Sequence, residues 1–313
     1  MDNRQPIDHQ AVVMMIVICA IWGLQQVAIK VAAQDVVPLF QIALRSGIAA
    51  VMVGLLLLLR RYRVQCSIDT WRGGTIVGVL FAIEYIAVSE GLGYTSAAHM
   101  VIFLYTAPIF AAIGLHFRFA SERLALVQWV GILIAFAGIT LAFYGPGATG
   151  ASASAQRFGD ALGLLAAIAW GATTLTIRCS RLTNAPAPLT LFYQLVVAFV
   201  ILGLMAWATG QNHMHVSMTA LASLAFQTVI FSFLSLMAWF WLLGRYLGSR
   251  LGVLSLLTPL FGVAFGVWLL GETLEASFVI GSILVLIGIG VVSGHDLLGK
   301  STRLRVLANQ ESS

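Results

Sequence analysis

The sequence predicts an all-α membrane protein whose ten transmembrane helices form two inverted five-helix repeats. Three observations predict this fold: the composition, the lengths of the apolar stretches, and a set of motifs that occurs twice. Of the 313 residues, 60% are hydrophobic and only 9% are charged, whereas soluble domains carry about 25% charged residues. Because so little charge cannot cover a surface in water, the composition excludes a soluble domain, a disordered chain, a disulfide scaffold and a nucleic-acid-binding protein. The lipid bilayer is the expected solvent.

Ten apolar stretches are long enough to cross a membrane, since a transmembrane helix needs roughly 20 mainly apolar residues. Most gaps between them are short, which predicts that neighbouring helices form hairpins. The predicted spans cover residues 11–33, 37–59, 73–92, 96–117, 124–144, 158–179, 186–208, 217–243, 248–270 and 275–294. Glycines at small-xxx-small spacing predict close helix contacts, at Gly74/Gly78, Gly159/Gly163, Gly262/Gly266 and Gly290/Gly294.

The basic residues predict how these spans are oriented. If the N-terminus lies inside, fourteen of the 17 Lys and Arg residues fall at cytoplasmic ends of spans, which is a strong positive-inside signal. The expected location is a bacterial-type inner (plasma) membrane, with both termini in the cytoplasm. The net charge of +5 then records topology rather than an anionic partner. The fourteen are Arg4, Arg60, Arg61, Arg63, Arg72, Arg118, Arg123, Arg178, Arg181, Arg245, Arg250, Lys300, Arg303 and Arg305.

Motifs in the first half recur in the second, 148 to 151 residues later. Ala-Ile-Trp-Gly at 20–23 is matched by Ala-Trp-Gly at 169–171, and Leu-Tyr-Thr-Ala-Pro at 104–108 by Ser-Leu-Leu-Thr-Pro at 255–259. Because each half holds five spans, the second half enters from the opposite side, as in secondary transporters. A duplicated bundle without transport is the alternative. The predicted parts are a cytoplasmic N-terminus, a repeat, a linker, a second repeat and a cytoplasmic tail, at 1–10, 11–145, 146–157, 158–294 and 295–313.

Short motifs in the same order in both halves carry a family resemblance: Trp22-Gly23 with Lys30, Tyr94-Thr95-Ser96-Ala97-Ala98, Pro108 followed by Glu122-Arg123-Leu124, and Pro259 followed by Gly271-Glu272-Thr273-Leu274. With them, nearly the whole chain resembles the drug/metabolite transporter superfamily, in its ten-helix EamA-type branch. The resemblance implies an inner-membrane carrier, often an exporter, and leaves the substrate open. Because Thr273 stands where the first half has Arg123, equivalent gate chemistry in the two halves is not expected.

Two prolines predict kinked helices that line a cavity. Pro108 and Pro259 each lie about twelve residues into their spans, at matching positions of the two repeats. A proline inside a helix removes a backbone hydrogen bond, and a carbonyl freed in lipid needs a partner or water. Interrupted helices at corresponding positions indicate a binding site between the repeats. A packing kink without a ligand is the alternative.

Ionisable residues inside the spans are the second set of candidates. Arg45 and Glu84 are predicted roughly 12–14 Å below the outer surface, at 1.5 Å per residue, and they are the natural pair because unpaired charge in a membrane is costly. Lys30, Glu90 and His99 lie nearer the outer surface, where Lys30 and Glu90 would form a second pair. Each pair is either a structural salt bridge or a site for a proton or a substrate, with Glu84 or Glu90 as the titrating group.

Polar and aromatic residues on one helix face complete the predicted substrate cavity. Trp22, Gln26 and Lys30 recur at every fourth residue, on one face of the first span, and Trp170, Thr174 and Arg178 repeat the pattern in the sixth. This order suits an amphipathic solute, although a helix–helix contact would also explain it. Further polar cavity candidates are Tyr105, Tyr193, Gln194, Ser255 and Thr258.

These patterns predict a secondary active transporter that exports amino acids or related small metabolites by alternating access, with proton exchange as the drive. The alternatives are an uptake permease for a small metabolite or drug, and a membrane receptor or scaffold without flux. No catalytic set or nucleotide-binding loop is found, so neither an enzyme nor a cofactor is expected. His213-x-His215 is too short a pair to predict a metal site. The expected partners are a small-molecule substrate, the lipid bilayer and protons, without nucleic acid or an obligate protein partner.

Overall fold

The computed structural model describes residues 8–60, 68–120, 123–144, 151–246, 251, 254–255 and 257–292. The regular elements in this part of the chain are helical. They are α1 (His9–Val31), η1 (Ala32–Gln34), α2 (Pro38–Leu59), α3 (Ile68–Gly91), α4 (Ala97–Leu104), α5 (Ala107–Arg118), α6 (Leu126–Tyr144), α7 (Ala151–Cys179), η3 (Arg181–Asn184), α8 (Ala187–Ala208), α9 (Met218–Ala225), η4 (Phe226–Ser235), α10 (Leu236–Arg245) and α12 (Leu257–Leu270). The helix Ala276–Val292 follows α12 and is called the last helix below.

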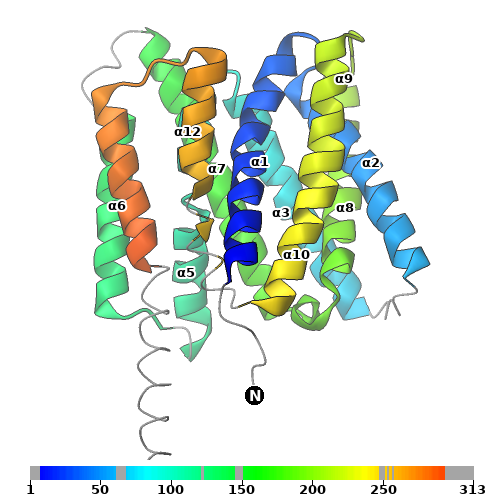
Figure 1. Cartoon of the computed structure of the whole chain (residues 1–313), viewed down its shortest axis with the longest axis horizontal. Helices are drawn as coiled ribbons and strands as arrows, with labels where there is room; N and C mark the ends of the chain where they lie inside the picture. The colour runs from blue at the N-terminus through cyan, green and yellow to red at the C-terminus, as the bar shows by residue number, and fades with distance from the viewer. Residues whose placement is uncertain are drawn as a thin grey trace, which may run out of the picture.

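The predicted all-helical fold with ten crossings is confirmed. Within the described residues, seven helices are long and apolar enough to span a membrane, and three shorter apolar helices fall at the remaining predicted spans: Leu126–Ala142, Leu257–Leu270 and Ala276–Val292. Figure 1 shows these helices running side by side in one bundle. One helix starts earlier than expected, because α7 begins at Ala151, inside the predicted linker 146–157. The predicted tail 295–313 and Gly294 lie outside the described residues.

Large apolar side chains cover the outside of the bundle. Leu59 and Leu126 are each 81% exposed, and Trp268 is 77% exposed. In water such side chains would form an unfavourable surface, whereas a lipid bilayer presents hydrocarbon of the same polarity. The chain is therefore a multi-pass membrane protein, and its polar residues are sorted toward the interior and the helix ends.

A hydrogen bond from Tyr246 to Asp8 joins the end of α10 to the beginning of α1. Asp8, the N-cap of α1, accepts hydrogen bonds from the backbone N–H of Ala11 and from the hydroxyl of Tyr246, both at 2.8 Å. The Ala11 N–H and then the Tyr246 hydroxyl stabilise the ionised carboxylate, so the pKa of Asp8 lies below its usual value. The contact ties together two helices that lie more than 200 residues apart in sequence.

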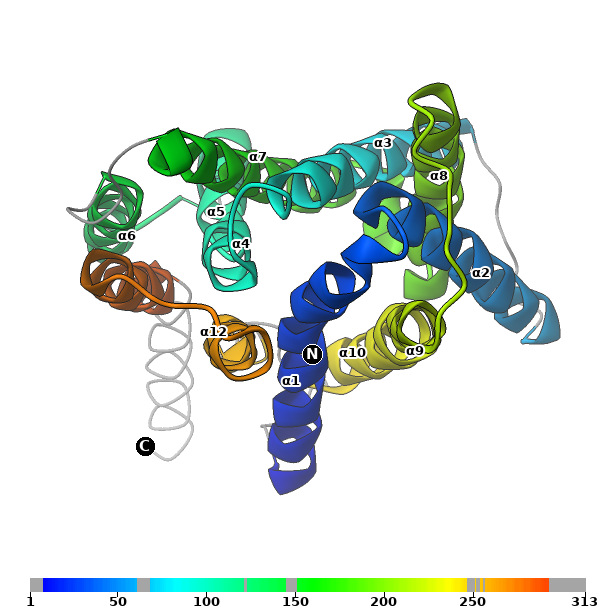
Figure 2. The ribbon, with the colours of Figure 1, turned by 90° about the horizontal axis from the view of Figure 1, so that it is seen from above.

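Glycine contacts show a two-fold relation between the halves. A Cβ added at Gly138 in α6 would lie 2.6 Å from the carbonyl oxygen of Gly281 in the last helix, and the reverse distance is also 2.6 Å. Gly131 and Gly288 face each other in the same way. In the repeat, Gly131 matches Gly281 and Gly138 matches Gly288. Each glycine of α6 therefore contacts the equivalent of the other α6 glycine, as expected for two antiparallel helices from inverted repeats. Both views place these two helices side by side at one edge (Figures 1 and 2).

Each repeat packs its first helix against the proline-containing helix of the other repeat (Figure 2). A Cβ added at Gly23 of α1 would lie 2.7 Å from the backbone nitrogen of Gly262 in α12, and one added at Gly171 of α7 would lie 3.0 Å from the backbone nitrogen of Ala111 in α5. Gly23 matches Gly171 in the repeat, and Gly262 matches Ala111. The glycine of each Trp-Gly motif therefore allows one backbone to approach another.

The sequence predicts that Pro108 and Pro259 kink their helices, whereas the structure places each proline in the first turn of a helix. The fourth span is broken, because α4 ends at Leu104 and α5 begins at Ala107, with Pro108 in its first turn. α12 begins at Leu257, so Pro259 also lies in a first turn. Proline is favourable there, since its missing N–H would have no partner within the helix. The breaks place helix ends inside the bundle.

The eighth crossing contains a π-helical segment that the sequence does not predict. Within the expected span 217–243, α9 passes into η4, a π-helix of ten residues, and then into α10. Its backbone hydrogen bonds run from residue i to i+5 and so change the register of the helix faces. Such segments are rare and are frequent at functional sites.

Candidate functional site

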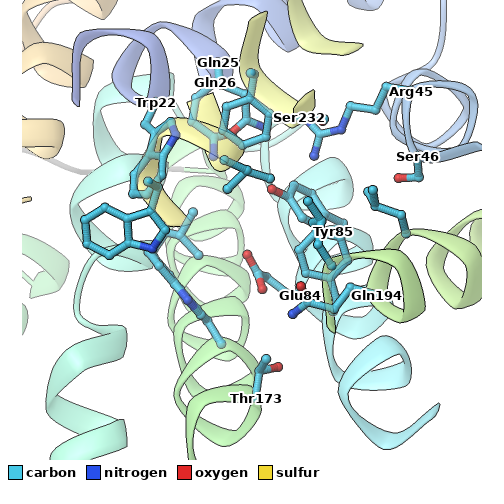
Figure 3. Close-up of a pocket in the computed structure, with 18 of the residues that line it drawn as sticks. Trp22, Gln25, Gln26, Arg45, Ser46, Glu84, Tyr85, Thr173, Gln194 and Ser232 are labelled. Atoms are coloured by element: carbon cyan, nitrogen blue, oxygen red, sulfur yellow. The ribbon is translucent and has the colours of Figure 1, made fainter. Parts of the chain in front are cut away.

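A cavity of about 170 Å³ lies between the two repeats (Figure 3). It is slightly larger than the roughly 150 Å³ cavity that takes up benzene in an engineered protein, so a small solute fits. Helices α1, α2, α3 and α4 with the residue after it form its walls in the first repeat, and α7, α8, η4 and α10 in the second. The wall residues are Trp22, Gln25, Gln26, Arg45, Ser46, Phe81, Glu84, Tyr85, Leu104, Tyr105, Trp170, Thr173, Leu191, Gln194, Leu195, Phe231, Ser232, Leu236 and Trp239.

The structure brings seven of the thirteen predicted cavity residues together in these walls, namely Trp22, Gln26, Arg45, Glu84, Tyr105, Trp170 and Gln194. The other six are Pro108, Thr174, Tyr193, Ser255, Thr258 and Pro259. Pro108, Ser255 and Pro259 lie at the helix breaks, and the Thr174 hydroxyl donates to the Trp170 carbonyl at 3.3 Å. The ring of Tyr193 packs against Gly74 of α3, and the backbone carbonyl of Thr258 lies against Gly23 of α1.

Arg45 does not form the predicted pair with Glu84. Among the described residues no ion pair within 4.0 Å joins them; instead, Nη1 of Arg45 lies 3.4 Å from Oε1 of Gln227. The guanidinium carbon also lies 4.4 Å from the ring centre of Tyr85 and 5.0 Å from that of Phe231, which are cation–π contacts. Arg45 is 1% exposed. Its charge is therefore buried at the cavity without a carboxylate partner.

Glu84 brings a carboxyl group into the same cavity. It is 5% exposed, and in Figure 3 its carboxylate points into the space beside Gln194, with Tyr85 between it and Arg45. No Lys or Arg nitrogen within the described ranges comes within ion-pair distance of it. Because unpaired charge in a membrane interior is costly, a ligand or a proton is the natural partner for this carboxylate.

Three buried polar atoms of the cavity walls also lack a hydrogen-bond partner among the described residues. They are Nε2 of Gln25, Oε1 of Gln26 and Oγ1 of Thr173. Gln25 and Gln26 of α1 correspond in the repeat to Thr173 and Thr174 of α7, so the unpartnered atoms come from both repeats. Buried polar groups are normally satisfied, and a donor and an acceptor left open beside one cavity indicate that it takes up a polar solute.

Aromatic side chains enclose the rest of the cavity. Nε1 of Trp22 donates to the Ser235 hydroxyl at 2.8 Å, and the Trp22 and Trp239 rings meet edge to face at 5.4 Å between centres. Tyr105 and Trp170 make a second edge-to-face pair at 5.3 Å. These contacts fix the ring orientations. The site thus combines a guanidinium, a carboxyl group, amide and hydroxyl groups, and an aromatic enclosure.

A second polar cluster lies near the C-terminal end of α1, where Lys30 is located. Nζ of Lys30 donates to the Thr95 carbonyl at 2.8 Å and lies 3.4 Å from Oε1 of Glu272. The Glu272 carboxylate accepts the backbone N–H groups of Ala97 and Ala98, at 2.7 and 3.0 Å. It therefore caps the N-terminus of α4, where a negative charge is favourable, and it joins the second repeat to the first.

The predicted Lys30–Glu90 pair is corrected by this cluster. Lys30 pairs with Glu272, because the start of α4 brings the loop after α12 close to α1, whereas Glu90 lies half-buried near the end of α3 and outside the cavity walls. Neither Lys30 nor His99 borders the cavity. Because Glu90 follows Glu84 by six residues, about 240° around a helix, the two carboxyl groups lie on different faces of α3.

His99 belongs to a buried dyad that the sequence reasoning missed. Its Nδ1 lies 3.0 and 3.1 Å from the two carboxylate oxygens of Asp160, and the Thr95 hydroxyl donates to the same carboxylate at 2.5 Å. The Phe278 ring stacks on the imidazole at 3.7 Å between centres. Asp160 is an acidic residue within the predicted span 158–179, and a charge inside a span could have indicated this site. The dyad joins α4, α7 and the last helix.

The histidine pair His213 and His215 does not gather metal ligands. Nδ1 of His215 lies 3.6 Å from Oδ1 of Asp35, and the two segments also meet in an isolated bridge. Across the residues with described positions, no group of three or more His, Cys, Asp or Glu side chains has the arrangement of a metal site.

Comparison with known proteins identifies the class. The fold and the enclosed polar cavity are those of a membrane transporter, and the chain belongs to the EamA-like transporter family, whose family model matches residues 9–144 and 157–294. The match confirms the resemblance to the drug/metabolite transporter superfamily. One crystal structure shares the fold, with a TM-score of 0.64 at 19% identity, covering 91% of this chain and 98% of the other.

Curated relatives are similar along most of the chain. An uncharacterized transporter, YoaV, of Bacillus subtilis is 23% identical over 276 residues, covering 88% of this chain and 94% of the relative. Proteins named as probable amino-acid metabolite efflux pumps are 27% identical in Salmonella typhimurium and 26% identical in Escherichia coli. Each aligns over 288 residues, which is 88% of this chain and 91% or 92% of the relative.

Proposed function

We propose that the protein is a secondary active transporter that exports amino acids or related small metabolites by alternating access. The observation that carries the proposal is the cavity between the repeats, where Arg45 and Glu84 are buried without pairing. A zwitterion would neutralise both charges at once. The names of the two efflux pumps support the same substrate class, and the inverted repeats support a rocking motion around a site between them.

The second polar cluster, which faces outward in the proposed orientation, supplies a contact that such a motion would break. Lys30 of α1 and Glu272 of the second repeat meet at the N-terminus of α4. Opening the cavity to the outside requires α1, α4 and α12 to separate there. When the outer side is closed, the ion pair and the helix-capping hydrogen bonds stabilise that state, and loss of these contacts accompanies opening.

Glu84 is the proposed proton-binding group. A carboxylate that crosses the membrane in an empty carrier must be neutralised, since moving an uncompensated charge through the bilayer is costly. A proton serves that purpose when no substrate amine is present, so protons would move inward as substrate moves outward. Glu90, the other predicted candidate, lies outside the cavity walls and is not needed for this step.

The proposed location is a bacterial-type inner membrane with both termini in the cytoplasm, which the positive-inside pattern supports. Uptake instead of export is the second transport direction that the same cavity permits. A receptor without flux would use the cavity for binding alone.

The test is flux of amino acids through the purified protein in liposomes. Vesicles loaded with a mixture of radiolabelled L-amino acids should release at least one of them faster than protein-free vesicles, and an inward proton gradient should accelerate the release. Comparing the culture medium of overexpressing and control cells gives the direction of net transport. Binding without any flux would contradict transport, and accumulation inside overexpressing cells would contradict export.

A further inference from the structure

Arg45 has more hydrogen-bond donors than partners. A guanidinium offers five N–H groups. Within the described part of the chain, Nη1 lies 3.4 Å from Oε1 of Gln227, and the Tyr85 hydroxyl is the second hydrogen-bonding group beside the guanidinium. The rings of Tyr85 and Phe231 lie over the guanidinium, so its edge remains for further hydrogen bonds. A buried guanidinium with unused donors beside a cavity is a site for an anionic group.

Gln227 is held in one orientation by its own hydrogen bonds. Its Nε2 donates to Oε1 of Gln41 at 2.8 Å and to the Ser223 hydroxyl oxygen at 2.9 Å. Nε2 of Gln41 in turn donates to two backbone carbonyl oxygens, at 3.1 and 2.7 Å. Because both N–H groups of the Gln227 amide are used, its oxygen is the atom that faces Arg45. The hydrogen-bond network therefore determines which way the Gln227 amide points.

The π-helical segment supplies two of the three side chains that contact the guanidinium, and the third, Tyr85, belongs to α3. Gln227 and Phe231 belong to η4, and so does Ser232 in the cavity wall. Arg45 itself lies on α2 of the other repeat. The arrangement therefore uses the second repeat to orient a charged residue of the first, so the position of Arg45 depends on how the two repeats are packed.

We propose that Arg45, positioned by Gln227, binds the carboxylate of the transported substrate. The proposal rests on the proposed function and narrows its substrate class to small solutes with a free carboxylate. A guanidinium edge binds a carboxylate through two parallel N–H···O hydrogen bonds. Amides and decarboxylated amines cannot supply these bonds. Gln227 is a positioning residue, and Arg45 is the group that contacts the substrate.

The test compares each amino acid with its amide in binding to the purified full-length protein. The twenty standard L-amino acids are the probes, and quenching of tryptophan fluorescence is the readout, since Trp22, Trp170 and Trp239 line the cavity. For the amino acid that binds best, the amide should bind about 10- to 100-fold more weakly, because hydrogen bonds to charged groups contribute about 1.5–3 kcal/mol. Arg45→Gln should bind acid and amide alike, and Arg45→Lys should keep part of the preference.

Gln227→Leu tests the positioning role even if Arg45→Gln does not fold. It should weaken binding of the acid about tenfold and leave binding of the amide unchanged, whereas a merely structural role would weaken both equally. The matched control is Gln128→Leu, a buried glutamine of α6 that donates to the Val292 carbonyl and lies outside the cavity walls. It should leave the preference for the acid unchanged.

Two results would overturn the assignment of Arg45: equal binding of acid and amide by the wild-type protein, or an unchanged preference in Arg45→Gln. These results leave transport itself standing if the liposomes still release amino acids. If no amino acid is bound or released, the proposed substrate class fails together with the assignment. The two failures are therefore distinguishable.

Discussion

Replacing Glu84 with glutamine should uncouple substrate flux from the proton gradient. The amide has nearly the shape of the carboxylate but neither ionises nor binds a proton, so the cavity keeps its form and loses its negative charge. We expect gradient-driven release to fall by about 30-fold or more, because the amide cannot form the proposed ion pair with the substrate amine, and removing one partner of a buried charge pair costs about 2–5 kcal/mol. The measurement is release from liposomes containing Glu84→Gln, with and without an inward proton gradient.

Glu90→Gln is the matched control for this experiment. It makes the same chemical change on the same helix, at a half-buried residue outside the cavity walls. Release through Glu90→Gln should still respond to the gradient. If Glu84→Gln responds as the wild-type protein does, or if Glu90→Gln alone abolishes the response, Glu84 is not the proton-binding group.

Replacing Gly23 with alanine should destabilise the contact between the repeats. The added methyl group would lie 2.7 Å from the Gly262 nitrogen and 2.9 Å from the Thr258 carbonyl oxygen. Both atoms belong to the backbone, so no side-chain rotation relieves the clash, and overpacking of this kind typically costs about 1–3 kcal/mol. Separation of α1 from α12 also displaces Trp22 from the cavity wall. We expect a lower unfolding temperature in detergent and weaker amino-acid binding.

Gly203→Ala is the control for this substitution. Gly203 lies in α8 with no atom within 4 Å of an added Cβ. There, alanine should be neutral or stabilising by about 0.5–1 kcal/mol, because glycine is the poorer helix former. An unfolding temperature for Gly23→Ala equal to or above that of Gly203→Ala would contradict the close packing of α1 on α12.

The sequence was sufficient for the crossings and their two-fold relation because both depend on local patterns. Apolar length marks each span, and the paired glycines of α6 and the last helix occupy equivalent positions. The broken fourth span was predicted only as a kink. Proline marks the interruption, but whether a helix bends or restarts depends on how the neighbouring helices pack around it.

The candidate site was predicted in part. Arg45 and Glu84 were identified because charged residues inside a membrane span are costly. Trp22 and Trp170 were identified because they occupy matching positions of the two repeats. Their contacts could not be predicted, since Lys30 and Glu272 are 242 residues apart in sequence and only the packed bundle brings them together.

The remaining predictions were limited because the sequence does not determine which face of each helix points into the cavity. Thr173 borders the cavity where Thr174 was expected, a difference of one residue that a periodicity argument does not resolve. Gln227 was not singled out, because its role depends on a π-helix that apolar spacing does not indicate.

Alternating access to the cavity is the central claim, and labelling of one cavity residue from both sides of the membrane tests it most directly. Ser232 lies in the wall, and the chain has three cysteines, so Ser232→Cys is made after Cys19, Cys66 and Cys179 are replaced. A membrane-impermeant maleimide should label this cysteine in right-side-out and in inside-out vesicles, and a bound amino acid should slow both reactions. Labelling from one side alone under every condition, without protection by any amino acid, would contradict the account.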